Sequence, residues 1–112
     1  MSKLAIRIDP QDNVAMAMET LTAGETLSVL SDEAQEVDRV TVAGDVPLAY
    51  HKVALAGIEP GDPILKYGEI IGYATTSIGR GEWVHLHNVE SVNYRARTGA
   101  FDRRRAGSES DG

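Results

Sequence analysis

The chain opens with apolar residues that alternate with polar or small ones, at Leu4, Ile6 and Ile8. This period of two predicts a strand, and Asp9-Pro10 ends it. The polar stretch over residues 31–36 predicts a loop. Two further strands are predicted on either side of that loop, at Leu27 and Val29 and at Val40 and Val42.

One short helix is predicted over residues 14–20. Its alanines and methionines suit a buried helical side. Asp12 or Asn13 can cap it, because a short polar side chain accepts hydrogen bonds from the first free N–H groups of a helix. We therefore expect a mostly β fold with a single short helix.

One local pattern occurs three times, with the form apolar residue, two residues, glycine, acid, one residue, apolar residue. It covers residues 21–27, 58–64 and 78–84. Glycine supplies the positive φ of a tight turn, and the flanking apolar residues anchor both sides of the turn in the core. The spacings are unequal, which indicates a reused turn-into-strand element and not a repeat array. After Pro47, to about Val92, we expect short strands separated by such turns.

Length and charge limit the classes of function. The 112 residues predict one folded domain over residues 1–93 and an Arg-, Gly- and Ser-rich tail over residues 94–112. The tail carries five arginines against three acids, which leaves residues 1–93 with 6 basic and 14 acidic residues, a balance of −8. A body of that sign repels nucleic acid and anionic membranes. With no cysteine, no signal-peptide pattern and no long apolar run, we expect a cytoplasmic protein that does not enter membranes.

The groups that can move protons or hold anions lie in three short clusters. They contain every histidine of the chain and two of its three lysines, in His51-Lys52, Lys66-Tyr67-Gly68 and His85-Leu86-His87-Asn88. In a strand, His85 and His87 would share one face, where they could bind a divalent metal, act as acid and base, or simply face water. An isolated His-x-His motif does not decide among these three readings.

The other two clusters add anion-binding groups. In a strand His51 and Lys52 would point to opposite faces, so only one of them would join a given site directly. Lys66 offers a point charge for a carboxylate, Tyr67 a hydroxyl, and Gly68 a turn. Trp83 and Ile78 are most simply core residues.

Taken in order, these segments resemble a known family. Asp12-Asn13-Val14-Ala15, Pro47 with His51-Lys52-Val53-Ala54-Leu55, Lys66-Tyr67-Gly68 with Ile71-Gly72 and Ala74-Thr75, and Gly81-Glu82-Trp83-Val84-His85-Leu86-His87-Asn88 look like the N-terminal module of the altronate/galactarate dehydratase family. The resemblance covers about residues 4–92. It implies an SAF domain of the β-clip fold.

The resemblance also implies a function. Members of the family remove water from an anionic sugar acid, an aldonate or aldarate, to give a 2-keto-3-deoxy acid, and depend on a divalent metal such as Fe²⁺ or Mn²⁺. This chain would then be the small subunit of such a hydro-lyase, inactive without a large catalytic subunit that holds most of the metal site; it could also form a homo-oligomer. The candidate catalytic residues are His85, His87 and His51. The candidate substrate-binding residues are Lys52, Lys66, Tyr67 and Asn88, and the candidate metal ligands are His85 and His87.

Two other functions stay open. A sister group, the two-subunit sulfolactate sulfo-lyases, uses the same small module and eliminates sulfite from (R)-sulfolactate. Nothing in the clusters separates a hydroxyl from a sulfonate leaving group, because both leave from the β carbon of an anionic substrate. The third function is a non-catalytic SAF module for carbohydrate binding or assembly, since a fold alone does not fix a function.

Overall fold

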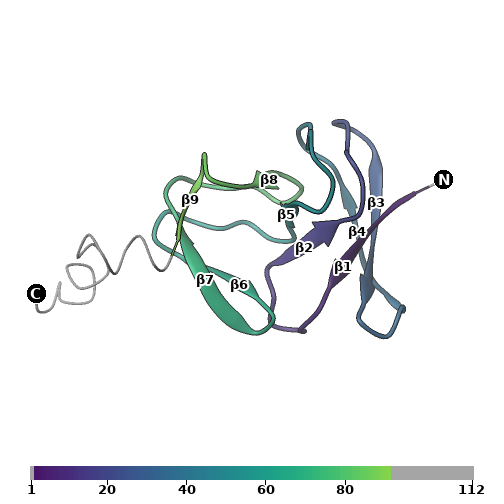
Figure 1. Ribbon diagram of the computed structural model, residues 1–112. Coiled ribbons are helices and arrows are strands. Elements are labelled where there is room, and N and C mark those ends of the chain that lie inside the picture. The colour runs from purple at the N-terminus through teal and green to yellow at the C-terminus, as the bar shows by residue number, and fades with distance from the viewer. Residues whose placement is uncertain (1, 92–112) are drawn as a thin grey trace, which may run out of the picture.

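The computed structural model describes residues 2–91, which form nine strands in two sheets (Figure 1). The larger sheet has the order β4-β3-β1-β2-β5-β8 and the smaller has the order β6-β7-β9. The strands are β1 (Lys3–Arg7), β2 (Val14–Ala17), β3 (Thr26–Ser31), β4 (Glu36–Thr41), β5 (Lys52–Ala54), β6 (Pro63–Lys66), β7 (Glu69–Ala74), β8 (Trp83–Val84) and β9 (Val89–Ser91). The predicted tail, residues 94–112, lies outside the described part.

The mostly β prediction is confirmed, but the predicted helix is wrong. Within residues 2–91 no helix forms, and residues 14–17 are β2. This strand pairs with β1 on one side and β5 on the other. Its apolar residues also serve two cores, because Val14 packs in one hydrophobic cluster while Ala15 and Ala17 pack in another. Only an extended chain can present both faces in this way, so tertiary pairing overrides the helical preference of alanine and methionine.

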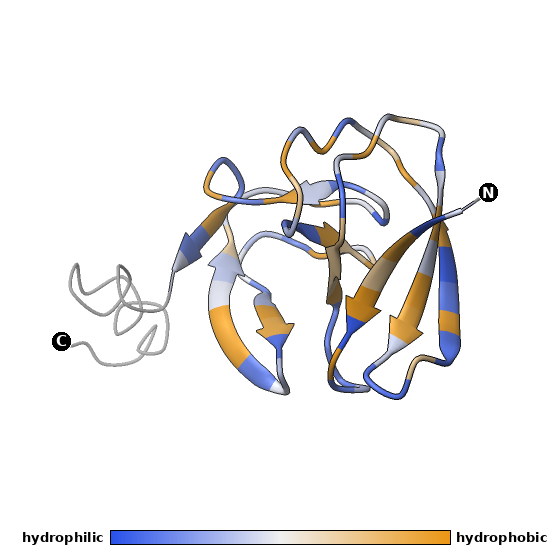
Figure 2. Ribbon diagram, turned by 45° about the vertical axis from the view of Figure 1, so that its right-hand side comes forward, coloured by the Kyte–Doolittle hydropathy of each residue, from blue (hydrophilic) through white to orange (hydrophobic). Residues whose placement is uncertain are grey.

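The two hydrophobic clusters lie on opposite faces of the larger sheet. One is built around Leu27, Val29, Val40 and Val53, and the other is covered by the smaller sheet through Ile64 and Ala74. The predicted strands at residues 27–29 and around Val40 are confirmed as β3 and β4. The edge strand β4 is mostly hydrophilic, as expected where one face and one edge meet water (Figure 2).

The first strand is confirmed, but the side chains that it turns toward the core are not the ones that the alternation suggested. Ala5, which is fully buried, supplies its core face, whereas Leu4 and Ile8 are 44% and 37% exposed. The small methyl group of Ala5 suits this position because β1 sits between β2 and β3 over the core. Alternation thus predicted the strand, but it did not predict which face the core would take.

The three glycine turns are built alike, as the repeated pattern predicts. In each, the residue after the glycine donates its N–H to the carbonyl three residues earlier, and the glycine φ is close to 90°. These values are those of a type II turn, whose third position requires a positive φ. Each glycine N–H also donates to the carbonyl of a residue at the end of a strand or just after it, and the N–H of that residue donates to the carbonyl of the residue after the glycine. The partners are Val42 for Gly24, Ala74 for Gly61 and Ala54 for Gly81.

The second and third turns are tied to each other reciprocally. Ala54, which precedes the second turn, bonds to the third, and Ala74, which precedes the third turn, bonds to the second. Ile58 and Ile78 exchange both backbone hydrogen bonds across the interface, at 2.8 Å each. Residues 54–62 and 74–82 therefore form a reciprocal pair, in which the residue before each turn is hydrogen-bonded to the other turn.

Asp12 and Asn13 hold the smaller sheet against the larger. The Asp12 carboxylate accepts N–H groups from Asp9, Tyr67 and Gly68 at 3.1, 3.0 and 2.8 Å. The Asn13 amide donates to the Pro63 carbonyl and accepts the Leu65 N–H, at 3.0 and 2.8 Å. These residues were expected to cap a helix; instead they bind the β6–β7 hairpin, which turns at two residues with positive φ, Tyr67 and Gly68.

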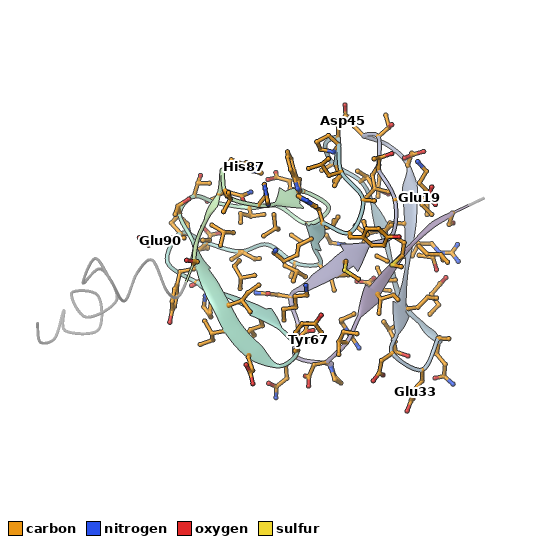
Figure 3. All side chains as sticks on the ribbon, viewed as in Figure 1. Glu19, Glu33, Asp45, Tyr67, His87 and Glu90 are labelled. Carbon is orange, nitrogen blue, oxygen red and sulfur yellow. The ribbon has the colours of Figure 1, made fainter. Side chains whose placement is uncertain are left out.

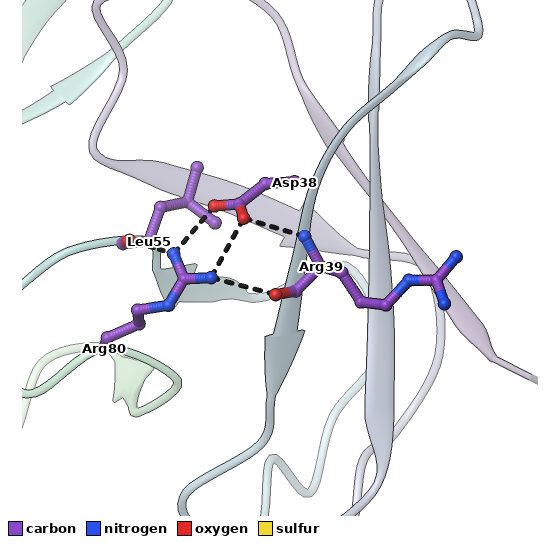
Figure 4. Close-up of polar contacts among 4 residues, drawn as sticks. All are labelled: Asp38, Arg39, Leu55 and Arg80. Carbon is purple, nitrogen blue, oxygen red and sulfur yellow. Dashed lines mark hydrogen bonds and ion pairs between the residues drawn. The ribbon is translucent and has the colours of Figure 1, made fainter.

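A fourfold contact of Arg80 secures the segment that leads into β8 (Figure 4). Its guanidinium donates two hydrogen bonds to the Asp38 carboxylate, with N···O distances of 2.7 and 2.9 Å. It also donates to the carbonyls of Leu55 and Arg39. The paired guanidinium holds the pKa of Asp38 below its usual range. Arg80 thereby connects the third glycine turn to β4 on the opposite edge of the larger sheet.

The part of the chain described here contains no helix long and apolar enough to cross a membrane.

Replacing Asp12 with alanine should destabilise the fold. The substitution leaves three backbone N–H groups without their acceptor, and Asp12 is only 6% exposed, so water replaces it poorly. We expect a loss of about 2–3 kcal/mol in the free energy of unfolding, measured by urea denaturation. Asp32→Ala, in the exposed β3–β4 turn, is the matched control and should change stability by less than about 0.5 kcal/mol. Equal effects of the two substitutions would contradict the anchoring role.

Candidate functional site

The antiparallel pairing of β5 and β8 brings His51 and His85 together. Lys52 lies opposite Val84 and Val53 opposite Trp83, so extending this register by one residue places His51 opposite His85. Their ring centroids are 4.5 Å apart. Two histidines far apart in sequence thus become neighbours through strand register.

Trp83 contacts all three histidines. Its ring is stacked on that of His85 at 5.3 Å with an interplanar angle of 8°, and it is tilted against His87 at 4.9 Å. Its indole N–H donates to Nδ1 of His51 at 3.2 Å. The expectation of a simple core residue is therefore incomplete, because Trp83 packs on the hydrophobic core and also organises the imidazoles.

The strand predicted for residues 85–87 is wrong. The strand β8 ends at Val84, and residues 85–88 form a turn in which the Asn88 N–H donates to the His85 carbonyl at 3.0 Å. The Asn88 side chain, 4% exposed, accepts the His85 N–H and donates to the Trp83 carbonyl. The turn leaves Leu86 at its tip, 79% exposed.

Lys52 and His51 both lie near His85, but only Lys52 lines a groove with it. The two residues do not share a strand, because β5 begins at Lys52 and His51 precedes it. That only one of them joins a given site directly stays a prediction. Burial, followed by the nearby charges of His51, Lys52 and His87, lowers the pKa of His85. Both members of the pair are thus close enough to act on His85 electrostatically. A groove of about 180 Å³ is lined by Lys52, Ile71, His85, Leu86, Val89 and Ser91.

Lys66 and Tyr67 extend the cationic region without touching the histidines. Burial and then the charge of Lys66 lower the pKa of Lys52, so the two ammonium groups lie within electrostatic reach of each other. The Lys66 ammonium also lies over the Tyr67 ring, 5.1 Å from its centroid. Tyr67 is at the tip of the β6–β7 hairpin, well below His87 in the view of Figure 3.

His87 faces a different groove from His85. That groove, of about 290 Å³, is lined by Ala43, Gly44, Asp45, Glu82, Trp83 and His87. The structure therefore brings together His51, Lys52 and His85, and it places Lys66 within electrostatic reach of Lys52. His87 also acts on His85 electrostatically but lines a different groove.

The sequence matches a known family. The sequence model of the altronate/galactarate dehydratase SAF domain fits residues 3–92. The chain belongs to this family. The mostly β structure agrees with the fold that the resemblance implied.

Curated relatives are similar over most of the described domain. Altronate dehydratase of Bacillus subtilis (strain 168) is 36% identical over 89 residues, and that of Escherichia coli (strain K12) is 40% identical over 86 residues. The matched segments cover 80% and 77% of this chain but only 16% of each of those proteins. The (2R)-sulfolactate sulfo-lyase subunit alpha of Chromohalobacter salexigens is 30% identical over 87 residues, which cover 77% of this chain and 92% of that subunit.

The described residues of this SAF domain do not complete a metal site. Within residues 2–91 no three histidine or carboxylate side chains converge closely enough to hold a metal ion. His51 and His85 offer two imidazoles, but Nδ1 of His51 is engaged by Trp83 and the ammonium of Lys52 lies nearby. A cation beside the donors opposes binding of a second cation. The predicted metal ligands His85 and His87 line different grooves, and their role stays a prediction.

Sequence reasoning missed the roles of Asp12, Asn13 and Trp83. The first two were assigned to the wrong partner, since nothing local indicates a hairpin more than fifty residues away. Trp83 did carry a signal, because an indole followed by histidines two and four positions later is an unusual setting for a core residue.

Substituting Lys52 should raise the pKa of His85. In Lys52→Met one neighbouring cation is removed while the apolar stem is kept, so the imidazolium is less disfavoured; burial, the larger cause, remains. An NMR titration of the ring signals measures the shift, with Lys3→Met as the distant control. An unchanged His85 pKa would contradict the proximity of the two groups.

The same lowered pKa fixes the direction of a pH effect on stability. Because the folded pKa of His85 lies below the unfolded value of about 6.5, the unfolded chain binds more protons between the two values. The contribution of His85 is therefore fully present above about pH 6.5 and is lost as the pH falls through the folded pKa.

Asn88→Ala should lower stability in addition to any effect on substrate. It removes the acceptor of the His85 N–H and the donor to the Trp83 carbonyl, at a cost of about 1–3 kcal/mol. Thermal or urea unfolding measures this cost. If Asn88 acted on substrate only, the substitution would raise KM while leaving the unfolding midpoint unchanged.

Proposed function

We propose that this SAF domain supplies one wall of the active site of a sugar-acid dehydratase, as the small partner of a large catalytic portion. The observation that carries the proposal is that Lys52 and His85 line one groove, with the ring of His51 4.5 Å from that of His85, in a member of the altronate/galactarate dehydratase family. The substrate would be an aldonate or aldarate, and the product a 2-keto-3-deoxy acid.

Lys52 and Lys66 are suited to hold the substrate carboxylate. The domain around them is acidic, so an anion must be drawn in by local cations. Burial, and after it the charge of Lys66, lowers the pKa of Lys52, so the charged form of Lys52 is disfavoured in the free protein. A carboxylate bound beside the two lysines offsets the repulsion between them, which gives the anion a larger favourable interaction than either lysine would supply separately.

His85 is suited to be the base. Its lowered pKa keeps the imidazole neutral near pH 7, with a lone pair ready to accept the proton on the carbon next to the carboxylate. As that C–H bond breaks, the neighbouring C–O bond breaks with its electron pair on oxygen. The leaving oxygen takes up a proton, which His85 now carries, and departs as water. The enol that remains becomes the 2-keto acid when a proton adds to the carbon that lost the hydroxyl.

The remaining groups of the active site would come from the large portion. The altronate dehydratases contain the matched segment as only 16% of their length, so most of each enzyme lies elsewhere. A divalent metal such as Fe²⁺ or Mn²⁺ would have to find most of its ligands there as well, and would supply charge stabilisation to the substrate.

A sulfolactate sulfo-lyase is the second candidate function. It is favoured by the match to 92% of the subunit alpha of the Chromohalobacter salexigens enzyme. The same base and cations would serve, because the reaction again removes the proton next to a carboxylate. The C–S bond would then break with its electron pair on sulfur, and sulfite would leave.

The two functions are separated by assaying the chain together with a large catalytic polypeptide of the same family from the same organism, to be sought among the products of the neighbouring genes. A dehydratase forms a 2-keto-3-deoxy acid from altronate or galactarate, whereas a sulfo-lyase releases sulfite from sulfolactate. We expect turnover of a sugar acid by the mixture and none by either chain separately. Full activity of the large chain without its partner would overturn the proposal.

Two substitutions test the roles within that assay. Lys52→Ala should raise KM about 10- to 100-fold, since a charge-assisted hydrogen bond to the carboxylate contributes about 1.5–3 kcal/mol. His85→Ala should lower kcat by about 10²- to 10⁴-fold with a smaller effect on KM. Lys3→Ala, a lysine in β1 paired with Glu25, is the matched control and should leave both constants unchanged.

A further inference from the structure

We propose that Trp83 is a positioning residue that holds His51 as a neutral hydrogen-bond donor facing the substrate oxygen on which negative charge develops. This role rests on the proposed lyase function. It assigns different tasks to two neighbouring imidazoles: His85 accepts the proton and His51 stabilises the charge that the loss of this proton creates.

The hydrogen bond between Trp83 and His51 fixes the tautomer of His51. An indole N–H can only donate, so the Nδ1 atom that it contacts at 3.2 Å must be the nitrogen without a proton. A neutral His51 ring then carries its proton on Nε2. The same contact sets the plane of the ring, and with it the direction in which Nε2–H points.

His51 and His85 are held by the same indole in two different ways. Trp83 binds His51 through its edge and stacks on His85 through its face, at an interplanar angle of 8°. The two imidazole centroids lie 4.5 Å apart. Strand register brings the two rings together, and contacts with one side chain set their relative orientation.

Elimination next to a carboxylate requires such a pair. When the proton leaves the carbon, negative charge spreads onto the carboxylate oxygens, and a fixed N–H donor at that point lowers the barrier without being reorganised. A neutral imidazole is an adequate donor, because it needs only to polarise the oxygen and does not have to give up its proton. Lys52, beside the same groove as His85, supplies the balancing positive charge.

The backbone around His51 supports the same arrangement. The His51 carbonyl accepts the Ala17 N–H at 2.8 Å, and the Tyr50 N–H donates to the Ala17 carbonyl at 2.7 Å. Tyr50 itself adopts a φ of 65°, a left-handed conformation that non-glycine residues seldom take. The main chain and Trp83 thus constrain His51 from two sides.

The test begins with ¹⁵N NMR of the full chain without partner or substrate. We expect His51 to show an unprotonated Nδ1 and a protonated Nε2, with a scalar coupling across the N–H···N bond from the indole nitrogen to Nδ1. A proton on Nδ1 of His51, or an indole coupled to no imidazole nitrogen, would overturn the assignment. Because this measurement uses the unaltered chain, it does not depend on any variant folding.

Trp83→Phe then tests the function of the hydrogen bond. The phenyl ring can still stack on His85 but cannot donate, so the Nδ1–H tautomer of His51 should become populated. In the lyase assay kcat should fall about 10- to 100-fold through misplacement of the donor, while KM stays close to its original value because both lysines remain. A purely structural Trp83 would lower the unfolding midpoint and leave the tautomer and the kcat of the folded protein unchanged.

Tyr50→Phe is the matched control. It removes a polar group from an aromatic side chain next to His51, and the tautomer signals of His51 should not change. An equal change in the control would show that the signals do not report the Trp83 bond, and would overturn the inference. If the lyase turns over while His51 has its proton on Nδ1, the role of Trp83 is wrong and the lyase function stands. If there is no turnover, the proposed lyase function is wrong, and so is the catalytic role of His51.

Discussion

The arrangement of the domain depends on the contacts that Asp12 and Asn13 make with the β6–β7 hairpin. The two sheets share one hydrophobic cluster, but apolar contact is non-directional and would allow the hairpin to slide. Four hydrogen bonds between the two side chains and the hairpin backbone specify one position. That position sets Lys66 within electrostatic reach of Lys52, so the cationic part of the candidate site exists only because a buried carboxylate holds the backbone beside it.

The candidate site gathers basic side chains, histidines and lysines, in a domain whose net charge is negative. Burial lowers the affinity of Lys52 and His85 for protons, and the charges of neighbouring basic side chains act in the same direction. Such a cluster is unfavourable until an anion arrives. The unfavourable charge arrangement of the free protein therefore becomes part of its affinity for an acidic substrate, which is the usual way in which a functional site departs from what stability would select.

The sequence predicted the features that depend on local chemistry. Strand alternation indicated β1, β3 and β4, and the spacing of Gly24, Gly61 and Gly81 indicated three like turns, because only glycine readily takes the required φ. It failed at two segments. A helix was expected over residues 14–20 because the two strands that pair with residues 14–17 lie elsewhere in the chain and leave no local signal. The strand expected over residues 85–87 failed for a local reason, because the side chain of Asn88 accepts the His85 N–H and closes a turn. The site residues were found by type and order, but Trp83 was recognised only once strand register had placed His51 opposite His85.

The reciprocal pairing of the second and third glycine turns affects how the domain folds. Each turn takes its hydrogen bonds from the strand that precedes the other, and Ile58 and Ile78 lock the exchange at the centre. Neither segment can complete its backbone hydrogen bonds until the other segment is in place. The β6–β7 hairpin, which carries Lys66, lies between them in the sequence. The folding unit is therefore the whole stretch from β5 to β8, with a high share of non-local contacts, so it should open and close cooperatively and not fray one strand at a time. The cationic half of the site and its histidine half are consequently gained or lost together.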